Sequence, residues 1–314
     1  MSTQICQAVA AKDAVHTRLT ENNITVKEQL PLSAHTTFRI GGSAALAAFP
    51  ENAEQVRTVL LACREYGVPC ALVGNGSNLL CPDEGFAGCV LFTTAMKSIT
   101  VDGNVITAGA GTTLASICCT ARDLGLAGLA FAYGIPGTLG GAVCMNAGAY
   151  GGEIGDRIID VTYLDSKTGE IRTVPGAECQ FAYRTSRFSE HPDILLSARI
   201  STEYGDTDAI RAEMEDITAR RREKQPLEYP SAGSAFKRYP GYFTAQLIDE
   251  AGLKGTAVGG AQVSEKHAGF IINRGGATSA DVLSLIDLLR ERIHDLHDIW
   301  IEPEICTLSD CILP

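Results

Sequence analysis

The sequence has no hydrophobic run that approaches the roughly 20 residues needed to cross a bilayer. Its first twenty residues also lack the apolar core of about seven or more residues that a signal peptide requires, because charged side chains such as Lys12, Asp13 and Arg18 interrupt them. We therefore expect a cytoplasmic protein that neither enters a membrane nor binds one.

An excess of positive charge is also absent. The chain has 26 Lys and Arg against 37 Asp and Glu, a net charge of −11 at pH 7. Polyanions are held by Lys and Arg spread over an extended face, so nucleic acid is not an expected partner. A small anionic ligand is still compatible, because a few local cations and backbone N–H groups suffice to bind a phosphate.

The eleven cysteines lack the patterns of a disulfide scaffold or a metal site. Their number is odd, several lie in hydrophobic contexts, no CxxC occurs, and no His falls at zinc-ligand spacing from a cysteine pair. We therefore expect reduced thiols in the core and no bound metal.

What the chain does contain is enough apolar sequence for two or three domains: 314 residues, 45% of them hydrophobic. Apolar spacing and capping signals predict the secondary structure. The predicted helices run from Asn52 to a stop at Gly67 and over 113–124, 207–224, 243–251 and 280–294; the predicted strands are 68–73, 161–164, 194–200 and 299–308, with a hairpin over 99–108.

A glycine-rich turn follows the strand predicted at 68–73. Its sequence, Gly-Asn-Gly-Ser-Asn at 74–78, can point consecutive backbone N–H groups into one concavity, a nest able to hold a pyrophosphate. A Rossmann turn is excluded, because the third glycine of G-x-G-x-x-G is missing and Pro82 and Gly85 break the helix that should follow. The residues alone leave two interpretations open, a phosphate cradle and a plain structural turn.

A second glycine-rich tract occupies residues 125–155, which hold ten of the 32 glycines. Within it, residues 131–142 mix apolar and aromatic side chains with accessible backbone. A flavin ring requires apolar surface for its faces and main-chain hydrogen bonds for its polar edge. This tract and the nest can therefore hold a flavin dinucleotide, although an irregular core loop explains the tract equally well.

Six motifs in the same order resemble those of the UDP-N-acetylenolpyruvoylglucosamine reductases, from about residue 30 to residue 305. Each motif alone is modestly specific, whereas six in register are highly specific. They are Arg39-Ile40-Gly41-Gly42, residues 74–79, residues 131–155, Tyr183-Arg184-Thr185-Ser186-Arg187-Phe188, Ser231-Ala232-Gly233-Ser234-Ala235-Phe236-Lys237 and Glu302-Pro303-Glu304.

This resemblance implies an α+β protein with an FAD-binding fold of the vanillyl-alcohol-oxidase/p-cresol-methylhydroxylase type. Two α+β subdomains, 1–92 and 93–205, would precede a smaller α/β substrate-binding domain, 206–314, whose terminal strand near 299–308 would return to the active site. FAD would bind non-covalently between the subdomains. The expected contacts are Arg39, Ile40, Gly41, Gly74, Asn75, Gly76, Ser77, Asn78, Leu79, Gly134, Ile135, Pro136, Gly137, Gly140, Gly141 and Ala142.

The activity implied by the resemblance is the reduction of UDP-N-acetylglucosamine enolpyruvate to UDP-N-acetylmuramate in peptidoglycan precursor synthesis, with NADPH as co-substrate. The resemblance assigns catalysis to Arg184, Ser234 and Glu304. The guanidinium would fork onto the carboxylate or enolate oxygens of the substrate. The hydroxyl would donate a proton to C2, and the glutamic acid, with a raised pKa, would share protons with the enol and orient the arginine.

Taken without the resemblance, the same three residues permit plainer roles. The arginine can form a surface ion pair, with Arg187 as a local rival, and the serine can cap a turn or a helix. Glu302 and Glu304 would share one face of a strand, so periodicity does not choose between them.

Substrate binding is assigned to Lys224 and Lys237 by the same resemblance, although a cation at a helix C-terminus is favourable without any ligand. The chain is similar to the shorter version of the family, which lacks the loop whose tyrosine covers the uridine. The uridine contacts therefore stay open among several candidates, and the six histidines have no expected flavin or metal role. The candidates are Tyr204, Tyr229, Tyr239 and Tyr242.

Two other functions stay open. A different flavin oxidoreductase, acting on a hydroxy acid or an alcohol, would keep the glycine tracts but would not need the Ser-Ala-Gly-Ser motif. A UDP-sugar-binding protein with a decayed flavin site would purify colourless. The sequence leaves the oligomeric state open, and we favour a monomer.

Overall fold

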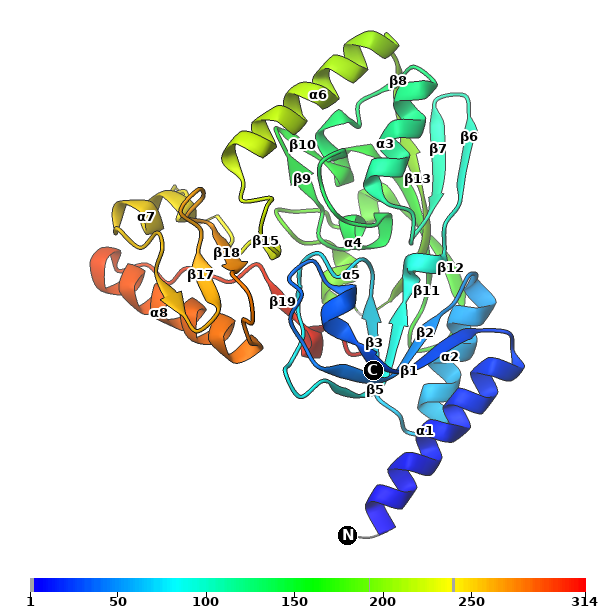
Figure 1. Ribbon diagram of the computed structural model, residues 1–314. Coiled ribbons are helices and arrows are strands. Elements are labelled where there is room, and N and C mark those ends of the chain that lie inside the picture. Colours follow the sequence, from blue (N-terminus) through cyan, green and yellow to red (C-terminus); the bar gives the residue numbers. More distant parts are fainter. Residues whose placement is uncertain (1–2, 192, 239–240) are drawn as a thin grey trace.

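The computed structural model describes residues 3–191, 193–238 and 241–314. It consists of three packed units, each with its own sheet (Figure 1). The helices are α1 (Thr3–Glu21), α2 (Ala53–Glu65), α3 (Leu114–Asp123), α4 (Leu139–Cys144), α5 (Arg187–Glu190), α6 (Thr207–Lys224), α7 (Thr244–Glu250) and α8 (Ser279–His297).

The first unit is a four-stranded sheet with the order β1-β2-β5-β3, covered on one face by α1 and α2. The outer pair β1–β2 is antiparallel, and β5 is parallel to both β2 and β3. The helix predicted from Asn52 is confirmed as α2, because the Asn52 side chain accepts the N–H of Gln55 as an N-cap. The strands are β1 (Thr25–Pro31), β2 (Ser43–Phe49), β3 (Cys70–Val73) and β5 (Phe86–Phe92).

The second unit is a five-stranded antiparallel sheet with the order β12-β11-β13-β7-β6. The predicted hairpin is confirmed as β6–β7, and the helix predicted over 113–124 is α3, which begins at the Thr113 cap. Both α3 and α4 pack into the core of this sheet. The strands are β6 (Ile99–Asp102), β7 (Val105–Gly109), β11 (Ile158–Leu164), β12 (Ile171–Pro175) and β13 (Ile194–Ser201).

Helix α6 has the predicted bounds but buries its apolar face in the second unit, and it meets the third unit at its C-terminal end, where Lys266 donates to the Arg222 carbonyl (2.7 Å). Its buried side chains, Ile210, Met214 and Ile217, belong to the core of the second unit. The boundary at residue 206 marks a change of periodicity from strand to helix, whereas packing is decided by which core the apolar face of the helix meets. The chain passes to the third unit only after α6 ends (Figure 1).

The third unit has an antiparallel sheet with the order β15-β18-β17-β16, with α8 packed against it and α7 beside α8. The predicted capping box at Thr278 and Asp281 is confirmed at the start of α8. The core of this unit also includes Phe38 and Ile40 from the first unit. The strands are β15 (Ser231–Ser234), β16 (Ala257–Val258), β17 (Ala261–Val263) and β18 (Phe270–Asn273).

The strand predicted over 299–308 is wrong for most of its length. Only β19 (Cys306–Thr307) is a strand, paired in parallel with β4 (Leu79–Leu80) of the first unit. The preceding residues form one isolated β-bridge with the third unit, Phe236 to Pro303, and pack Ile299, Ile301 and Ile305 into its core. A segment that crosses between two units meets each sheet edge for only a few residues, so it cannot form a long ladder (Figure 1).

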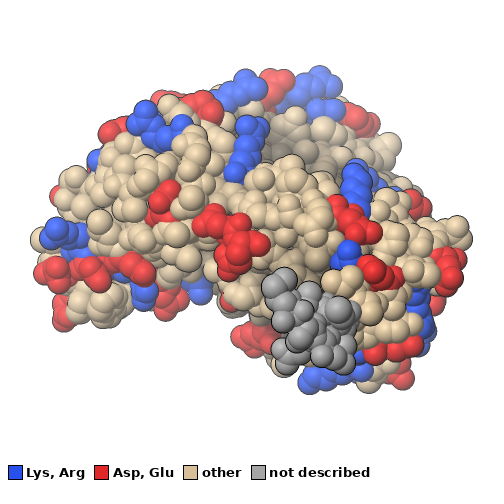
Figure 2. Space-filling view, turned by 60° about the horizontal axis from the view of Figure 1, so that its bottom comes forward, with Lys and Arg blue, Asp and Glu red and all other residues tan. Residues whose placement is uncertain are grey.

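Several surface and thiol features accompany this fold. Acidic and basic side chains are interspersed over the face in Figure 2. In the described ranges, no helix combines the length and the apolar character needed to cross a membrane. The ten cysteines whose side chains are described carry free thiols, and no three or more His, Cys, Asp or Glu among the described residues are grouped to hold a metal ion.

Candidate active site

The nest predicted at 74–78 lies between β3 and β4 and is followed by no helix, as expected. Gly76 has a φ of +60°, and a Cβ there would collide with the carbonyl oxygen of His35. The N–H of Thr37 donates to the Gly76 carbonyl (3.1 Å), so the residues after His35 form one wall of the nest. Glycine is therefore required here both for its left-handed backbone and for the close approach of another main chain.

The second glycine tract closes over the nest. The Asn75 side chain donates to the carbonyl of Pro136 (2.9 Å), and a Cβ at Gly137 would lie 3.7 Å from Oγ of Ser77. Asn75 and Pro136 are 61 residues apart in sequence. The two segments that contain them thus form one backbone-lined cradle between the first and second units. We call residues 74–78 together with 134–142 the glycine cradle.

Two buried threonine hydroxyls, Thr138 Oγ1 within the cradle and Thr36 Oγ1 next to it, have no hydrogen-bond partner. A Cβ at Gly74 would lie 2.8 Å from Thr138 Oγ1, and one at Gly76 would lie 3.0 Å from the Cα of Thr36. Buried polar groups are almost always paired, so two orphaned donors at one glycine-lined surface fit a polar ligand with oxygen acceptors. The cradle therefore fits the diphosphate of a dinucleotide.

The other predicted cofactor contacts differ in what they can offer. The side chains of Ile40, Leu79 and Ala142 are at most 4% exposed and pack into hydrophobic cores, so only their main chains are available to a ligand. Arg39 is exposed with a φ of +57°, and Gly41 has a φ of +122° at a point where a Cβ would meet Cys81. In the rest of the segment 134–142, Gly134, Ile135 and Gly137 are half-buried and Pro136 and Gly141 are exposed. Gly140 is buried, and a Cβ there would lie 3.2 Å from that of Ala110.

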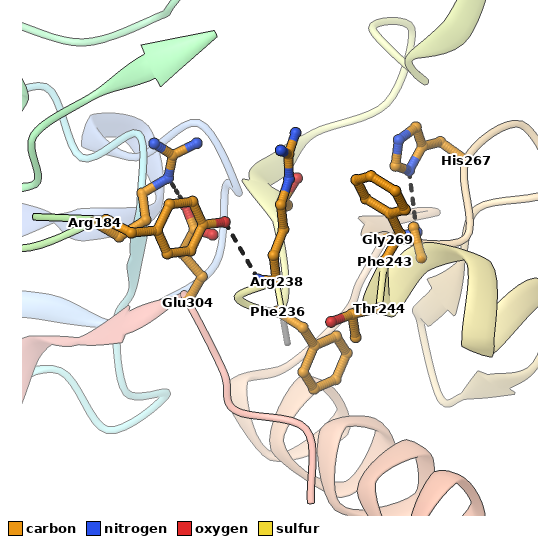
Figure 3. Close-up of a pocket in the computed structure, with 11 residues that line it drawn as sticks. Arg184, Phe236, Arg238, Phe243, Thr244, His267, Gly269 and Glu304 are labelled. Carbon is orange, nitrogen blue, oxygen red and sulfur yellow. Dashed lines mark hydrogen bonds and ion pairs between the residues drawn. The ribbon is translucent and has the colours of Figure 1, made fainter. Parts of the chain in front are cut away.

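A cavity of about 160 Å³ opens between the second and third units (Figure 3). Arg184 and Glu304 lie on one side of it, His267 and Phe243 on the other, and the Arg238 side chain stands between them. The lining residues are Tyr183, Arg184, Ser234, Phe236, Arg238, Phe243, Thr244, Ala245, His267, Gly269 and Glu304. The cavity therefore contains all three residues predicted to be catalytic.

Arg184 occupies a tight turn with strained backbone. The turn is closed by two bonds between Ala182 and Thr185, each 3.1 Å, and Arg184 has a left-handed φ of +57°. Its guanidinium donates from Nε to Glu304 Oε1 (2.7 Å) and from Nη2 to the Gly148 carbonyl (3.1 Å). Because these bonds use only part of the fork, the remaining N–H groups are available to a bound anion.

Glu304 is the carboxyl partner of this arginine, and its side chain is only 13% exposed. Burial raises the pKa of the Glu304 carboxyl, and the positive charge and hydrogen bond of Arg184 oppose that rise without cancelling it. Asn78 of the cradle donates to the Glu304 carbonyl (2.9 Å). Asn78 therefore holds the main chain of Glu304 at the cradle, while Arg184 holds its carboxyl in the cavity. Burial of that carboxyl favours its protonated form.

Ser234 is directed at the same cavity by an irregularity in its strand. The pairing of β15 with β18 shifts register between Ser231 and Ser234, which is a β-bulge, and Gly233 within it has a φ of +83°. The residue after Ser234 is bonded to the third catalytic candidate, Glu304, because the N–H of Glu304 donates to the carbonyl of Ala235 (2.8 Å). Three distant segments of the chain therefore meet around one small volume.

The structure also separates residues that the sequence left equivalent. Arg187 lies away from the cavity, with its guanidinium 5.2 Å from the ring of Tyr163 and 3.8 Å from Asp193. Glu302 is 71% exposed and faces Lys237, because the terminal segment is not a regular strand and does not keep both acids on one face. Only Arg184 and Glu304 of these two pairs line the cavity.

Neither predicted substrate-binding lysine has its side chain in the cavity wall. Lys224 is exposed at the end of α6, and Lys237 lies beside the cavity with its Nζ 3.4 Å from Glu302. Among the tyrosine candidates, Tyr204 is 75% exposed on β14 (Glu203–Tyr204), where it pairs with β8 (Leu126–Ala127) of the second unit. Tyr229 and Tyr242 are also exposed and do not line the cavity, and Tyr239 is outside the described residues.

Several residues of the site carried no signal in the sequence. Arg238 lines the cavity beside Phe243, and its N–H donates to the Tyr183 hydroxyl (3.2 Å). His267 lines the opposite wall, where burial lowers the pKa of its imidazole from 6.5. Arg221 of α6 packs against the cradle, since a Cβ at Gly134 would lie 2.5 Å from its Cδ. Arg221 belongs to the run of basic residues, Arg220 to Lys224, at the end of the helix predicted over 207–224.

Comparison with known proteins agrees with this division of the chain. Residues 44–175 match the family described as FAD binding domain, and residues 225–308 match UDP-N-acetylenolpyruvoylglucosamine reductase, C-terminal domain. The two matches cover the cradle and the third unit respectively. The predicted fold class, an FAD-binding fold followed by a smaller substrate domain, is confirmed.

Whole-chain relatives give the same result. A UDP-N-acetylenolpyruvoylglucosamine reductase of Lactobacillus acidophilus is 45% identical over 287 residues, 91% of this chain and 96% of that protein. One of Geobacillus thermodenitrificans is 43% identical over 290 residues, 92% of this chain and 94% of that protein. The crystal structure of the reductase from Thermus caldophilus has a TM-score of 0.77 and 33% identity, covering 90% of this chain and 98% of that chain. With identity of this level over nearly its full length, the chain belongs to the UDP-N-acetylenolpyruvoylglucosamine reductase family.

Proposed function

We infer that this chain catalyses the NADPH-dependent reduction of UDP-N-acetylglucosamine enolpyruvate to UDP-N-acetylmuramate, a step of peptidoglycan precursor synthesis. The observation that carries this conclusion is the Arg184–Glu304 pair, which lines a cavity next to a glycine cradle fitted to a dinucleotide. FAD would bind non-covalently in the cradle and would supply the hydride-transfer chemistry between NADPH and the substrate.

The role of Arg184 is to stabilise negative charge on the enolpyruvyl group. After the substrate accepts a hydride at C3, charge develops toward its carboxylate as an enolate. A guanidinium stays charged and can bind two oxygens at once, and the cavity excludes much of the solvent that would screen it. The hydrogen bonds from Arg184 to Glu304 and Gly148 support this role, because they hold the side chain before substrate arrives.

Ser234 donates the proton that C2 requires. A neutral hydroxyl is a weak acid, so the transfer needs a strongly basic carbon and nearby positive charge to stabilise the alkoxide. Arg184 and Arg238 line the same cavity and are suited to supply that charge. Glu304, whose pKa is raised by burial, shares protons with the enol and orients Arg184.

The remaining assignments follow from charge and position. The cradle residues and the Arg39–Gly41 segment hold FAD, while Lys224 and Lys237 bind the nucleotide end of the substrate as it enters between the units. We assign FAD binding to residues 1–92 and 93–205 and substrate binding to 206–314, the first helix of which, α6, packs on the second unit. The protein acts in the cytoplasm, where NADPH is found, and we propose that it is a monomer without a nucleic-acid partner.

The overall activity is tested by following the flavin colour. The purified protein is expected to be yellow, to bleach anaerobically with NADPH, and to recover its colour when the enolpyruvyl UDP-sugar is added. Recovery with oxygen but not with the sugar would instead favour a flavin oxidoreductase of different substrate. A colourless protein that takes up no added FAD would favour a UDP-sugar-binding protein.

The role of Ser234 is tested by dividing the reaction into its halves. Ser234→Ala should leave the bleaching by NADPH nearly intact while slowing reoxidation by the sugar by about 10⁴-fold or more, the upper end of what acid–base groups contribute. Ser231→Ala on the same strand is the matched control and should affect neither half. Equal slowing of both halves in Ser234→Ala would contradict a proton-donor role.

A further inference from the structure

Asn146 follows helix α4 at a position whose backbone would suit glycine. It is 2% exposed and has a left-handed φ of +41°. The N–H of Ala147 donates to the carbonyl of Ala142 (2.8 Å), which is the bond pattern that ends many helices with a left-handed glycine. Glycine suits this backbone best and asparagine is the usual alternative, so the contacts of the amide decide whether the side chain has a further role.

The Asn146 side chain instead makes three hydrogen bonds and leaves none of its hydrogen atoms unused. Nδ2 donates to Oε2 of Glu153 (2.8 Å) and to the carbonyl of Ala182 (2.9 Å). Oδ1 accepts the N–H of Gly155 (2.9 Å). The orientation of the amide is determined by these partners, because a carbonyl can only accept and a backbone N–H can only donate.

Two of these partners, Ala182 and Glu153, belong to the two structures that hold Arg184, and Gly155 follows the second of them. Ala182 begins the turn that carries Arg184, and its carbonyl also accepts the N–H of Thr185. Glu153 is paired with Gly148 in the small hairpin of β9 (Gly148–Ala149) and β10 (Gly152–Glu153), and the Gly148 carbonyl accepts from the Arg184 guanidinium. One buried amide thus joins the base of the arginine's turn to the hairpin that binds its tip.

The space for this amide is kept by another glycine. A Cβ at Gly155 would lie 2.8 Å from Oδ1 of Asn146 and would also overlap the ring of Phe181. A second bond reinforces the same arrangement, because Ser186 Oγ donates to the carbonyl of Cys144 at the end of α4 (2.8 Å). The end of α4 therefore holds the arginine's turn on both sides, at Ala182 and at Ser186.

We propose that Asn146 is a positioning residue that acts on catalysis through Arg184. The proposal rests on the function inferred above for Arg184. With the amide present, the turn and the hairpin keep a constant separation, so the guanidinium reaches both Gly148 and Glu304 and presents its free N–H groups to the enolate. Without it, the Ala182 side of the turn loses its bond to the end of α4 while the Ser186 bond remains, and the guanidinium has more positions available, most of them unproductive.

The test is Asn146→Gly, which keeps the left-handed backbone and removes only the three side-chain bonds. We expect bleaching by NADPH to stay within about twofold of the wild-type rate and reoxidation by the sugar to slow about 10- to 100-fold, the loss typical of a catalytic group displaced by about an ångström. Asn23→Gly is the matched control. Asn23 also follows a helix with a left-handed φ, +55°, and the same bond pattern, but it is exposed and should leave both rates unchanged.

A double-mutant cycle separates positioning from a general structural role. Because Asn146 acts through Arg184, Asn146→Gly should cost less than about twofold in an Arg184→Ala background. The same 10- to 100-fold loss in that background, or equal slowing of both half-reactions in the single variant, would overturn the inference. If Arg184→Ala alone reoxidises with the sugar at the wild-type rate, the role proposed for Arg184 fails, and this inference fails with it.

A second substitution covers the case in which the glycine variant does not fold. Asn146→Asp keeps the shape and the acceptor for Gly155 but replaces both donors, and it places a carboxylate beside Glu153. It should also slow the sugar half-reaction selectively, and by at least as much as Asn146→Gly. Wild-type reoxidation by Asn146→Asp would overturn the proposal.

Discussion

The glycine cradle and the cavity lined by Arg184, Ser234 and Glu304 lie side by side but are built in opposite ways. The cradle is made of main chain from which side chains are missing, and its walls are other backbone segments such as the one that follows His35. The cavity is made of charged and aromatic side chains from the second unit, the third unit and the terminal segment. Asn78 belongs to the cradle and also holds Glu304, so the two regions share one contact residue.

The two regions therefore tolerate different amino-acid substitutions. A backbone cradle fails where an added side chain would overlap a neighbouring main chain, as at Gly76, because that main chain cannot move aside. A side-chain cavity fails when a particular group is removed or displaced, because its chemistry depends on the position of that group. Substitutions in the cradle should therefore cause loss of FAD. Substitutions in the cavity should instead slow the half-reaction with the sugar.

The largest effect is expected from Gly76→Ala in the cradle. The added methyl group would overlap the His35 carbonyl and would also strain the left-handed backbone, so the protein should lose FAD and with it both half-reactions. The measurement is flavin absorbance per mole of purified protein. Gly67→Ala is the control, because Gly67 has a similar φ of +66° but nothing lies within 4 Å of its Cβ position. Full flavin content in Gly76→Ala would contradict the cradle.

A large but selective effect is expected from Arg184→Lys. Lysine keeps the charge but cannot form the fork, so reoxidation by the sugar should slow about 10²- to 10³-fold while the FAD content stays normal. Arg187→Lys, three residues later, should instead lower the melting temperature, because Arg187 stacks on Tyr163 and Phe188. If the two variants behaved alike in both assays, the separation of these arginines would be lost.

A smaller effect is expected on stability as a function of pH. Burial raises the pKa of Glu304 above its ordinary 4.5, so the folded protein keeps a proton that the unfolded chain releases. The resulting stabilisation is complete below pH 4.5 and is lost as the pH rises through the raised folded value. Because Glu304→Gln does not titrate, the melting temperature of the wild type should fall relative to this variant across that window. A constant difference between the two at every pH would argue against a raised pKa.

The smallest effect is expected from Thr278→Ala, outside both regions. This substitution removes half of the capping box of α8 and should cost about 1 kcal/mol of unfolding free energy. Both half-reactions should keep their rates at temperatures well below melting. Denaturant unfolding and stopped-flow measurements of flavin colour test the two statements. A selective loss of the sugar half-reaction would mean that the cavity senses the stability of the third unit as a whole.

Most local structure could be predicted from the sequence because its causes are local. The N-cap residues Asn52 and Thr278 begin α2 and α8 as expected, and the period of apolar residues predicted the bounds of α6. The nest could be predicted as well, because its two glycines, Gly74 and Gly76, are only one residue apart in sequence. The terminal segment was mistaken for a strand because alternating residues predict an extended chain and cannot show that its partners belong to two different units.

The cavity was predictable only in part. Arg184, Ser234 and Glu304 were found through resemblance, but sequence periodicity left Arg187 and Glu302 as equal candidates. Arg238, His267 and Asn146 carried no signal, since a single arginine, histidine or asparagine is ordinary in any sequence. Their roles depend on what lies opposite them, such as Tyr183 for Arg238 and Ala182 for Asn146.

The amino-acid sequence by itself determined the helices, the hairpin and the two glycine tracts, because backbone preference and apolar period act over a few neighbouring residues. Only the tertiary structure decided which core receives α6, which acid faces Arg184, and which amide holds its turn. Those outcomes depend on contacts between residues as far apart as Arg184 and Glu304, separated by 120 positions. At such separations the strength of an interaction is set by packing, burial and geometry, none of which is encoded in any single segment of the chain.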